Sequence, residues 1–215
     1  MFQTASFALS AAEPAQFPPE GGPEVAFSGR SNAGKSSAIN AVCARHKLAF
    51  VSRTPGRTQV INFYRIGADA YLVDLPGYGY ARVPFAVRAK WEHLLSAYLR
   101  TRRSLRGVFL VMDARHPLMA LDRSLLHWLT PTRRPVEVLL AKADKLTRSA
   151  AERQLAETRE ALARLYPTAG ARLFSSVDGT GVEEARAILM RWLQLEDDRR
   201  DDTPVDGSRA ATKRA

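Results

Sequence analysis

The sequence predicts an α/β fold, with a mostly parallel six-stranded sheet, one antiparallel edge strand and helices on both faces. Three observations lead to this prediction. Short apolar runs alternate with segments of helical period, and residues 107–112 are apolar throughout, as in a strand buried on both faces. Only residues 67–69 separate two strand-like runs, which is short enough for a hairpin. Ligands of such sheets bind beyond the carboxyl ends of the parallel strands.

Each element has a local signal in the sequence. Apolar runs with strand character predict strands at residues 24–28, 60–66, 70–74, 108–113, 136–141 and 172–175. Apolar residues at helical spacing predict helices at residues 35–44, 85–103, 121–129, 150–165 and 182–195. Ser149, with Glu152 three positions later, predicts a capping box at the start of the helix 150–165.

Composition indicates how the chain is organised. Residues 1–22 are rich in Pro and Gly and predict an irregular lead-in. Residues 23–195 are expected to form a single folded domain, and the charged residues 196–215 a disordered tail. No apolar run approaches the roughly 20 residues that cross a bilayer, and the first 29 residues hold no Lys or Arg for a secretory signal. Cys43 has no second cysteine with which to form a disulfide. We expect a cytoplasmic monomer that binds no membrane.

The charge balance favours a polyanionic partner. Lys and Arg number 32 against 22 acidic residues, and 26 of the 32 are Arg, whose planar fork pairs with phosphate. The cluster at Arg100, Arg102, Arg103 and Arg106 is the expected RNA-facing surface. A solvated basic face is the alternative, because Arg-rich composition also arises without nucleic-acid binding.

A complete phosphate-loop motif, G-x-x-x-x-G-K-S, lies between a predicted strand and a predicted helix. Its residues are Gly29, Arg30, Ser31, Asn32, Ala33, Gly34, Lys35 and Ser36. Backbone N–H groups of such a loop surround the α- and β-phosphates of a nucleoside triphosphate. Lys35 is expected to reach the β- and γ-phosphates, and the Ser36 hydroxyl to bind Mg²⁺.

Two further segments predict how the γ-phosphate is sensed. Asp74, Leu75, Pro76 and Gly77 form D-x-x-G after a strand, where Asp74 would hold Mg²⁺ through water and the Gly77 N–H would bond the γ-phosphate. The polar loop before the hairpin carries the predicted switch residues Gly56, Arg57, Thr58, Gln59 and Val60. Thr58 would give its hydroxyl to Mg²⁺ and its N–H to the γ-phosphate, so Lys35, Thr58 and Gly77 are the expected catalytic groups. An ordinary connecting loop with a solvated Thr58 is the alternative.

Residues at the ends of the last two strands predict guanine as the base. The segment Ala141, Lys142, Ala143 and Asp144 places a carboxylate where it accepts from guanine N1–H and the 2-amino group, with the Lys142 stem over the ring. Ser175 and Ser176 could offer backbone N–H groups to guanine O6, with an ordinary loop as the alternative, and Phe174 beside them completes the expected nucleotide-binding residues. Guanine-reading families usually have Asn or Thr where this chain has Ala141, so we expect affinity to be weaker by about 1 kcal/mol. An adenine-specific site stays open on that account.

These segments closely resemble the EngB (YihA/YsxC) family of TRAFAC-class P-loop GTPases. The resemblance rests on residues 24–37, 54–59, 73–81, 112–118 and 142–146 and covers about residues 17–195. It implies a bacterial cytoplasmic GTPase that uses Mg²⁺, assists assembly of the large ribosomal subunit and contacts its rRNA, and whose loss disturbs cell division and septation. Ala141 departs from the family's usual Thr.

Intrinsic hydrolysis is expected to be slow. Fast GTPases place a Gln directly after the D-x-x-G glycine to orient water, and this chain has Tyr78 there. Activation would come from a partner or from K⁺ held near Asn32, although Asn32 bonding only within its own loop is an equal alternative. Two functions stay open: a switch that leaves the ribosomal particle after hydrolysis, or a nucleotide-gated RNA-binding module in which hydrolysis is incidental.

Overall fold

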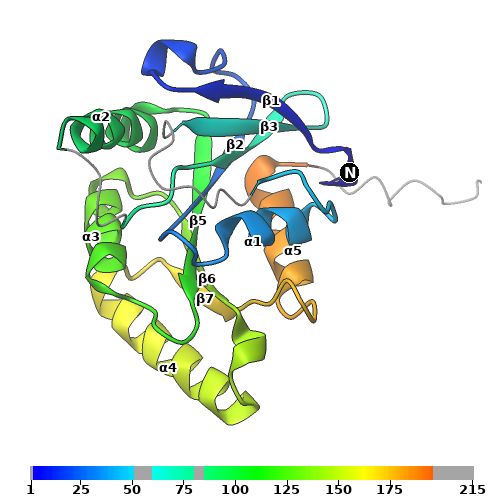
Figure 1. Cartoon of the computed structure of the whole chain (residues 1–215), viewed down its shortest axis with the longest axis vertical. Coiled ribbons are helices and arrows are strands. Elements are labelled where there is room, and N and C mark those ends of the chain that lie inside the picture. Colours follow the sequence, from blue (N-terminus) through cyan, green and yellow to red (C-terminus); the bar gives the residue numbers. More distant parts are fainter. Residues whose placement is uncertain (1, 51–59, 80–84, 196–215) are drawn as a thin grey trace, which may run out of the picture.

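The computed structural model describes residues 2–50, 60–79 and 85–195, and leaves out the side chains of residues 85–92. Seven strands form one sheet in the order β1-β3-β4-β2-β5-β6-β7 (Figure 1). Their bounds are β1 Ser6–Ala11, β2 Glu24–Gly29, β3 Ile61–Ile66, β4 Ala70–Asp74, β5 Leu105–Asp113, β6 Val136–Ala141 and β7 Gly170–Leu173. The five α-helices of the described residues are α1 Lys35–Val42, α2 Phe85–Thr101, α3 Ala120–Leu129, α4 Arg148–Leu165 and α5 Val182–Leu193.

The mostly parallel sheet is confirmed, but its edge differs from the prediction. Strands β4, β2, β5, β6 and β7 are parallel, whereas β3 is antiparallel to β4 and to β1. Within the described residues the sheet therefore has seven strands, not six, and the antiparallel strand β3 lies second from the edge. The extra strand β1 falls within residues 1–22, so the expectation of an irregular lead-in is wrong for Ser6–Ala11. Its outer position explains the weak signal, because five of its six residues are not fully buried.

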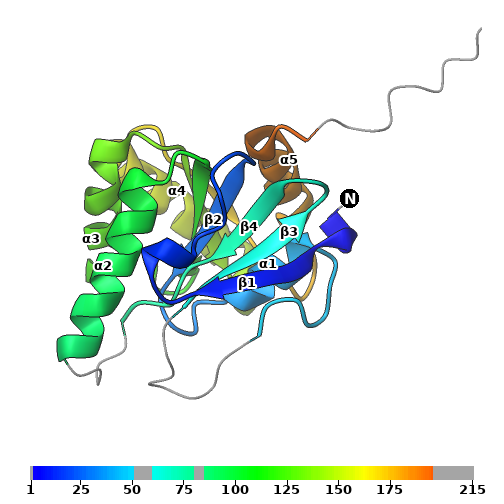
Figure 2. The same ribbon diagram turned by 90° about the horizontal axis from the view of Figure 1, so that it is seen from above.

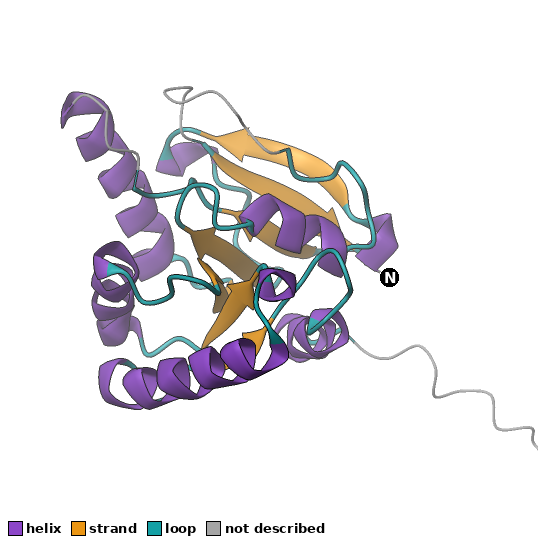
Figure 3. Cartoon of the chain, turned by 60° about the horizontal axis from the view of Figure 1, so that its bottom comes forward, coloured by secondary structure: helices purple, strands orange, loops and turns teal. Residues whose placement is uncertain are grey.

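Helices cover both faces of the sheet, as predicted. Helices α1 and α5 lie on one face, and α2, α3 and α4 lie on the other (Figures 2 and 3). The two apolar layers contain aromatic anchors such as Phe63 and Tyr98 on the α2 side and Phe27 and Phe109 on the α1 side. Cys43 is buried in the second layer, and burial raises the pKa of its thiol to about 12, so it stays protonated. No helix in the described ranges is both long and apolar enough to span a bilayer.

The start of α4 corrects one predicted cap. Thr147 is the N-cap residue, and its side chain accepts a hydrogen bond from the Ala150 N–H at 3.3 Å. Ser149 already lies inside the first turn, and Glu152 pairs with Arg148 instead of closing a capping box. The expected Ser149–Glu152 box is therefore wrong. Two hydroxyl residues lie within three positions here, and sequence alone does not select between them.

Candidate functional site

Loops from distant parts of the chain meet at the carboxyl edge of the parallel strands. Phe27 of β2 pairs with Asp74 of β4, and Asp113 of β5 pairs with Ala141 of β6, so neighbouring strands end level with one another. Backbone hydrogen bonds join the loops that follow these strands. The Ser31 N–H donates to the Tyr78 carbonyl at 2.9 Å, and the Ala143 N–H donates to the Phe174 carbonyl at 3.1 Å.

The phosphate-loop segment turns between β2 and α1 as its motif predicts. A Cβ on Gly29 would lie 2.5 Å from the Val111 carbonyl oxygen, so only glycine fits at the end of this strand. Gly34 is the N-cap of α1 with φ +110°, a left-handed conformation that L side chains rarely adopt. The loop therefore delivers the chain into the N-terminus of α1, where free N–H groups and the helix dipole favour an anion.

Lys35 is expected to contact phosphate, and Asp74 is expected to hold Mg²⁺. The structure pairs the two side chains directly in an ion pair. Their side chains are 12% and 8% exposed, so the two charges neutralise one another in a largely buried position. A bound nucleotide with its metal would have to separate them.

The oxygen groups expected to bind metal fit a hard divalent cation. The Ser36 hydroxyl donates to the Phe50 carbonyl at 3.3 Å, and Asp74 follows from the adjacent strand. A hydroxyl and a carboxylate are donors that Mg²⁺ prefers. Thr58, the third expected ligand, lies outside the described residues, as do Gly56, Arg57 and Gln59. Val60 is described, half-buried, directly before β3.

The D-x-x-G segment packs directly on the phosphate loop. A Cβ on Gly77 would lie 3.4 Å from both the Cα and the N of Ser31, and the Leu75 N–H donates to the Phe27 carbonyl at 3.0 Å. Leu75 and Pro76 are buried. The structure thus brings Gly77 beside the loop whose phosphate it is expected to sense.

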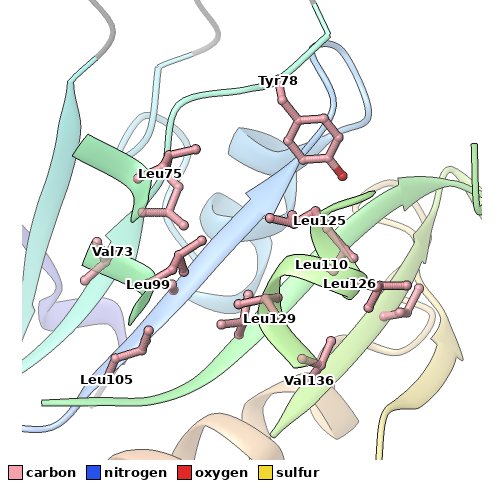
Figure 4. Packing of buried hydrophobic residues seen from close by; sticks show 14 of the residues in the cluster. Val73, Leu75, Tyr78, Leu99, Leu105, Leu110, Leu125, Leu126, Leu129 and Val136 are labelled. Atoms are coloured by element: carbon pink, nitrogen blue, oxygen red, sulfur yellow. The ribbon is translucent and has the colours of Figure 1, made fainter. Parts of the chain in front are cut away.

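Tyr78 points away from that loop and into the core. Tyr78 is 5% exposed and lies beside Leu125 of α3 in the apolar cluster shown in Figure 4. Its hydroxyl donates to Asp122 Oδ1 at 2.6 Å. Asp122 Oδ2 accepts the Met119 N–H at 2.9 Å. Burial, followed by the charge of Asp122, raises the pKa of the Tyr78 hydroxyl far above its ordinary value. This side chain is therefore not a base, and Asp122 is a partner that the sequence analysis missed.

Replacing Tyr78 with phenylalanine tests this position. The change leaves a buried Asp122 oxygen without its donor, so we expect unfolding free energy to fall by about 1–3 kcal/mol in urea. Single-turnover hydrolysis is expected to stay within about twofold of the parent rate, because the hydroxyl takes no part in the chemistry. A large loss of rate without a loss of stability would place the hydroxyl in the reaction.

The base-reading segment is held by side chains from β5 and from the loop after β7. Lys142 has φ +63°, and its Nζ donates to the Asn32 carbonyl at 2.7 Å and to Asp113 Oδ2 at 2.9 Å. Asp144 Oδ1 accepts from the Ser175 hydroxyl at 2.8 Å. That hydrogen bond is the main cause of the lowered pKa of Asp144, which keeps the carboxylate ionised to accept from a base.

One of the two expected guanine O6 donors is already engaged within the protein. The Ser175 N–H donates to the Thr180 carbonyl at 2.9 Å, and the N–H of the neighbouring Phe174 donates to the Leu140 carbonyl at 2.9 Å. The expectation that the Ser175 N–H faces the base is therefore wrong, and Ser175 instead orients Asp144 through its side chain. Ser176, exposed in the same loop, stays a candidate.

Arg102 corrects the predicted basic cluster. Its side chain is buried at 6% exposure and forms an ion pair with Glu24, so it does not face RNA. Arg100, Arg103 and Arg106 are exposed. Sequence alone does not show which arginine of a cluster turns inward, because Glu24 lies 78 residues away.

Fold and site together define a P-loop GTPase. A family model described as 50S ribosome-binding GTPase matches residues 24–142. The chain belongs to the EngB family of GTP-binding proteins. It is 51% identical over 194 residues to a probable GTP-binding protein EngB of Azoarcus sp. (strain BH72), covering 90% of this chain and 93% of the relative. A relative of the same description from Thiobacillus denitrificans is 54% identical, covering 89% and 92% of the two chains.

Solved structures are similar at the level of the fold. The crystal structure of a probable GTP-binding protein engB matches with a TM-score of 0.62 at 18% identity, over 80% of this chain and 100% of the other. Era from Aquifex aeolicus, bound to GDP and aluminium fluoride, matches with a TM-score of 0.63 at 19% identity, over 81% and 57% of the two chains. These structures show the fold, whereas the family model and the EngB relatives show that the protein is a GTP-binding GTPase.

Proposed function

We propose that this GTPase is a cytoplasmic switch that assists assembly of the large ribosomal subunit, with effects on cell division and septation. The meeting of the phosphate loop, the Asp74–Gly77 segment and the Ala141–Asp144 segment at one sheet edge supports a nucleotide-dependent switch. The description of the matching family model and the net charge of +10 are consistent with a ribosomal partner.

We assign the roles in the site by position. The N–H groups of residues 29–36 would cradle the phosphates, Lys35 would contact the β- and γ-phosphates, and the Gly77 N–H would sense the γ-phosphate. Ser36, Thr58 and Asp74 would hold Mg²⁺, which supplies charge neutralisation on the phosphates when bound. Asp144 would accept from the guanine edge.

Slow intrinsic hydrolysis is part of this proposal. The Tyr78 hydroxyl is hydrogen-bonded to Asp122 in the core, so activation of hydrolysis would come from a partner surface or from K⁺. Asn32, whose carbonyl is held by Lys142, stays the candidate ligand for an activating K⁺. Equal hydrolysis rates in KCl and NaCl would remove K⁺ from the account.

The exposed arginines supply a candidate rRNA surface. The guanidinium of Arg134 bonds the Arg102 carbonyl at 2.6 Å, which brings the exposed Arg133 beside the segment that carries Arg103 and Arg106. Arg103 and Arg106 lie where α2 ends and β5 begins, and Arg133 lies just before the parallel strand β6, so all three are at the opposite end of the strands from Asp113. The nucleotide and the RNA would therefore occupy opposite ends of the parallel strands.

Reversing Arg103 and Arg106 to Glu tests this surface. Each lost phosphate contact is expected to make the slope of log affinity against log salt less negative by about 0.7–0.9. The measurement is binding to large-subunit precursor particles between low and moderate salt. The matched control reverses Arg148 and Arg153, exposed on α4 with the same change of charge. Equal slopes for both double variants would contradict the assignment.

A non-hydrolysable GTP analogue separates the two functions left open. A switch that leaves after hydrolysis would be trapped on the precursor particle, and the bound fraction after sedimentation would rise several-fold over that with GTP. A nucleotide-gated module with incidental hydrolysis would show the same bound fraction with GTP and with the analogue.

A further inference from the structure

Asp113, at the carboxyl end of β5, accepts four hydrogen bonds although no role in the site has been assigned to it. Its Oδ1 accepts from the Arg115 N–H at 3.1 Å and from Arg115 Nε at 2.9 Å. Its Oδ2 accepts from Arg115 Nη2 at 2.7 Å and from Lys142 Nζ at 2.9 Å. The two-pronged contact with Arg115 fixes the plane of the carboxylate, so Oδ2 is directed at the Lys142 ammonium.

The charge on Asp113 is secured by these contacts. Hydrogen bonding from Arg115 is the main cause that holds the pKa of Asp113 well below its usual range, against the opposing effect of burial. The Asp113 side chain is 16% exposed, whereas Arg115 is 46% exposed and Lys142 is 33% exposed. The Asp113 carboxylate is therefore held in place and favoured in its ionised form, and it is less exposed than the two cations that it binds.

Lys142 connects the base-reading segment to the phosphate loop through its long side chain. Its Nζ also donates to the Asn32 carbonyl, and its Cε lies 3.9 Å from the position that a Cβ on Gly34 would occupy. Ala141 has no polar side chain to supply such a link, and its Cβ only packs near Gly34. Among the described residues, the side-chain hydrogen bond between these two segments comes from Lys142.

We propose that Asp113 is a positioning residue for base recognition: it holds the Lys142 ammonium so that the Lys142 stem covers the nucleobase and keeps the base-reading segment against the phosphate loop. This inference rests on the proposed base site at Lys142 and Asp144. Ala141 has no polar side chain with which to hydrogen-bond the phosphate loop, and the Asp113–Lys142–Asn32 hydrogen bonds take over that function. Arg115, which is more exposed, fixes the orientation of the Asp113 carboxylate.

A double-mutant cycle tests the proposal, with GDP affinity as the readout. Asp113→Asn is expected to weaken GDP binding about five- to tenfold, because it removes the charge that fixes Lys142. Lys142→Ala is expected to weaken it at least as much. If Asp113 acts through Lys142, the double variant is no weaker than Lys142→Ala alone. Independent, multiplying losses would show a merely structural role and overturn the proposal.

Further variants keep the result interpretable. Arg115→Gln leaves the carboxylate in place but frees its plane, so it is expected to cost about two- to threefold, again only when Lys142 is present. Arg148→Gln, in an exposed pair on α4, is the matched control and should bind GDP as the parent does. If Lys142→Ala leaves GDP affinity unchanged, the proposed base site itself is wrong. If Lys142→Ala weakens binding and Asp113→Asn does not, only this inference fails.

Discussion

Replacing Lys35 with alanine is expected to weaken GTP binding by about 100-fold or more. The change removes the ammonium expected at the β- and γ-phosphates, in a site where little water screens the charge, and a loss near 3 kcal/mol corresponds to that factor. It also leaves the Asp74 carboxylate, which is 8% exposed, without its partner in the nucleotide-free protein. Titration of a fluorescent GTP analogue measures the affinity, and urea unfolding without nucleotide measures the accompanying loss of stability.

The matched control for this experiment is Lys47→Ala. Lys47 is exposed in the loop after α1, so the same change of residue there should leave both measurements near those of the parent. Unchanged GTP affinity in the Lys35 variant would remove the phosphate loop from the account.

Replacing Arg102 with methionine is expected to destabilise the protein by about 3–5 kcal/mol, because the buried Glu24 carboxylate then loses its cationic partner. Arg102 Nε lies 3.0 and 3.1 Å from the two Glu24 oxygens, and Arg102 Nη2 donates to the Pro18 carbonyl at 2.8 Å. The Tyr98 hydroxyl donates to Glu24 Oε2 at 2.8 Å. Unfolding in guanidinium chloride measures the change in unfolding free energy.

Arg103→Met is the control for the Arg102 variant. Arg103 is the next residue and is exposed, so its replacement should change stability by no more than about 0.5 kcal/mol. Comparable small effects at the two positions would show that the Glu24–Arg102 pair contributes little. If the Arg102 variant stays folded and binds RNA more weakly while the Arg103 variant does not, Arg102 belongs to the RNA-facing surface after all.

Sequence predicts those parts of the fold and site that depend on residues close together in the chain. The phosphate loop needs glycine at Gly29 and Gly34 for reasons that are local, a close strand contact and a positive φ. Likewise, the hairpin of β3 and β4 follows from a three-residue connection between two strand-like runs. Such features depend on neighbours in the chain, so spacing alone reveals them.

The features that sequence analysis missed depend on partners far away in the chain. Strand β1 is recognisable only by its pairing with β3, since Ser10 meets Asn62 across 52 residues. Asp122 gains its role from Tyr78, 44 residues earlier, and Ser175 from Asp144, 31 residues earlier. None of these pairs has a spacing signature, because the loops between them vary freely in length.

Hydrogen exchange measured with and without GDP and Mg²⁺ tests the central claim most directly, namely that separate loops form one guanine nucleotide site. The account predicts that exchange slows together in residues 29–36, 74–77, 141–144 and 174–176, and that ATP at the same concentration leaves all four segments unchanged. Protection confined to one of these segments, or equal protection by ATP, would contradict it.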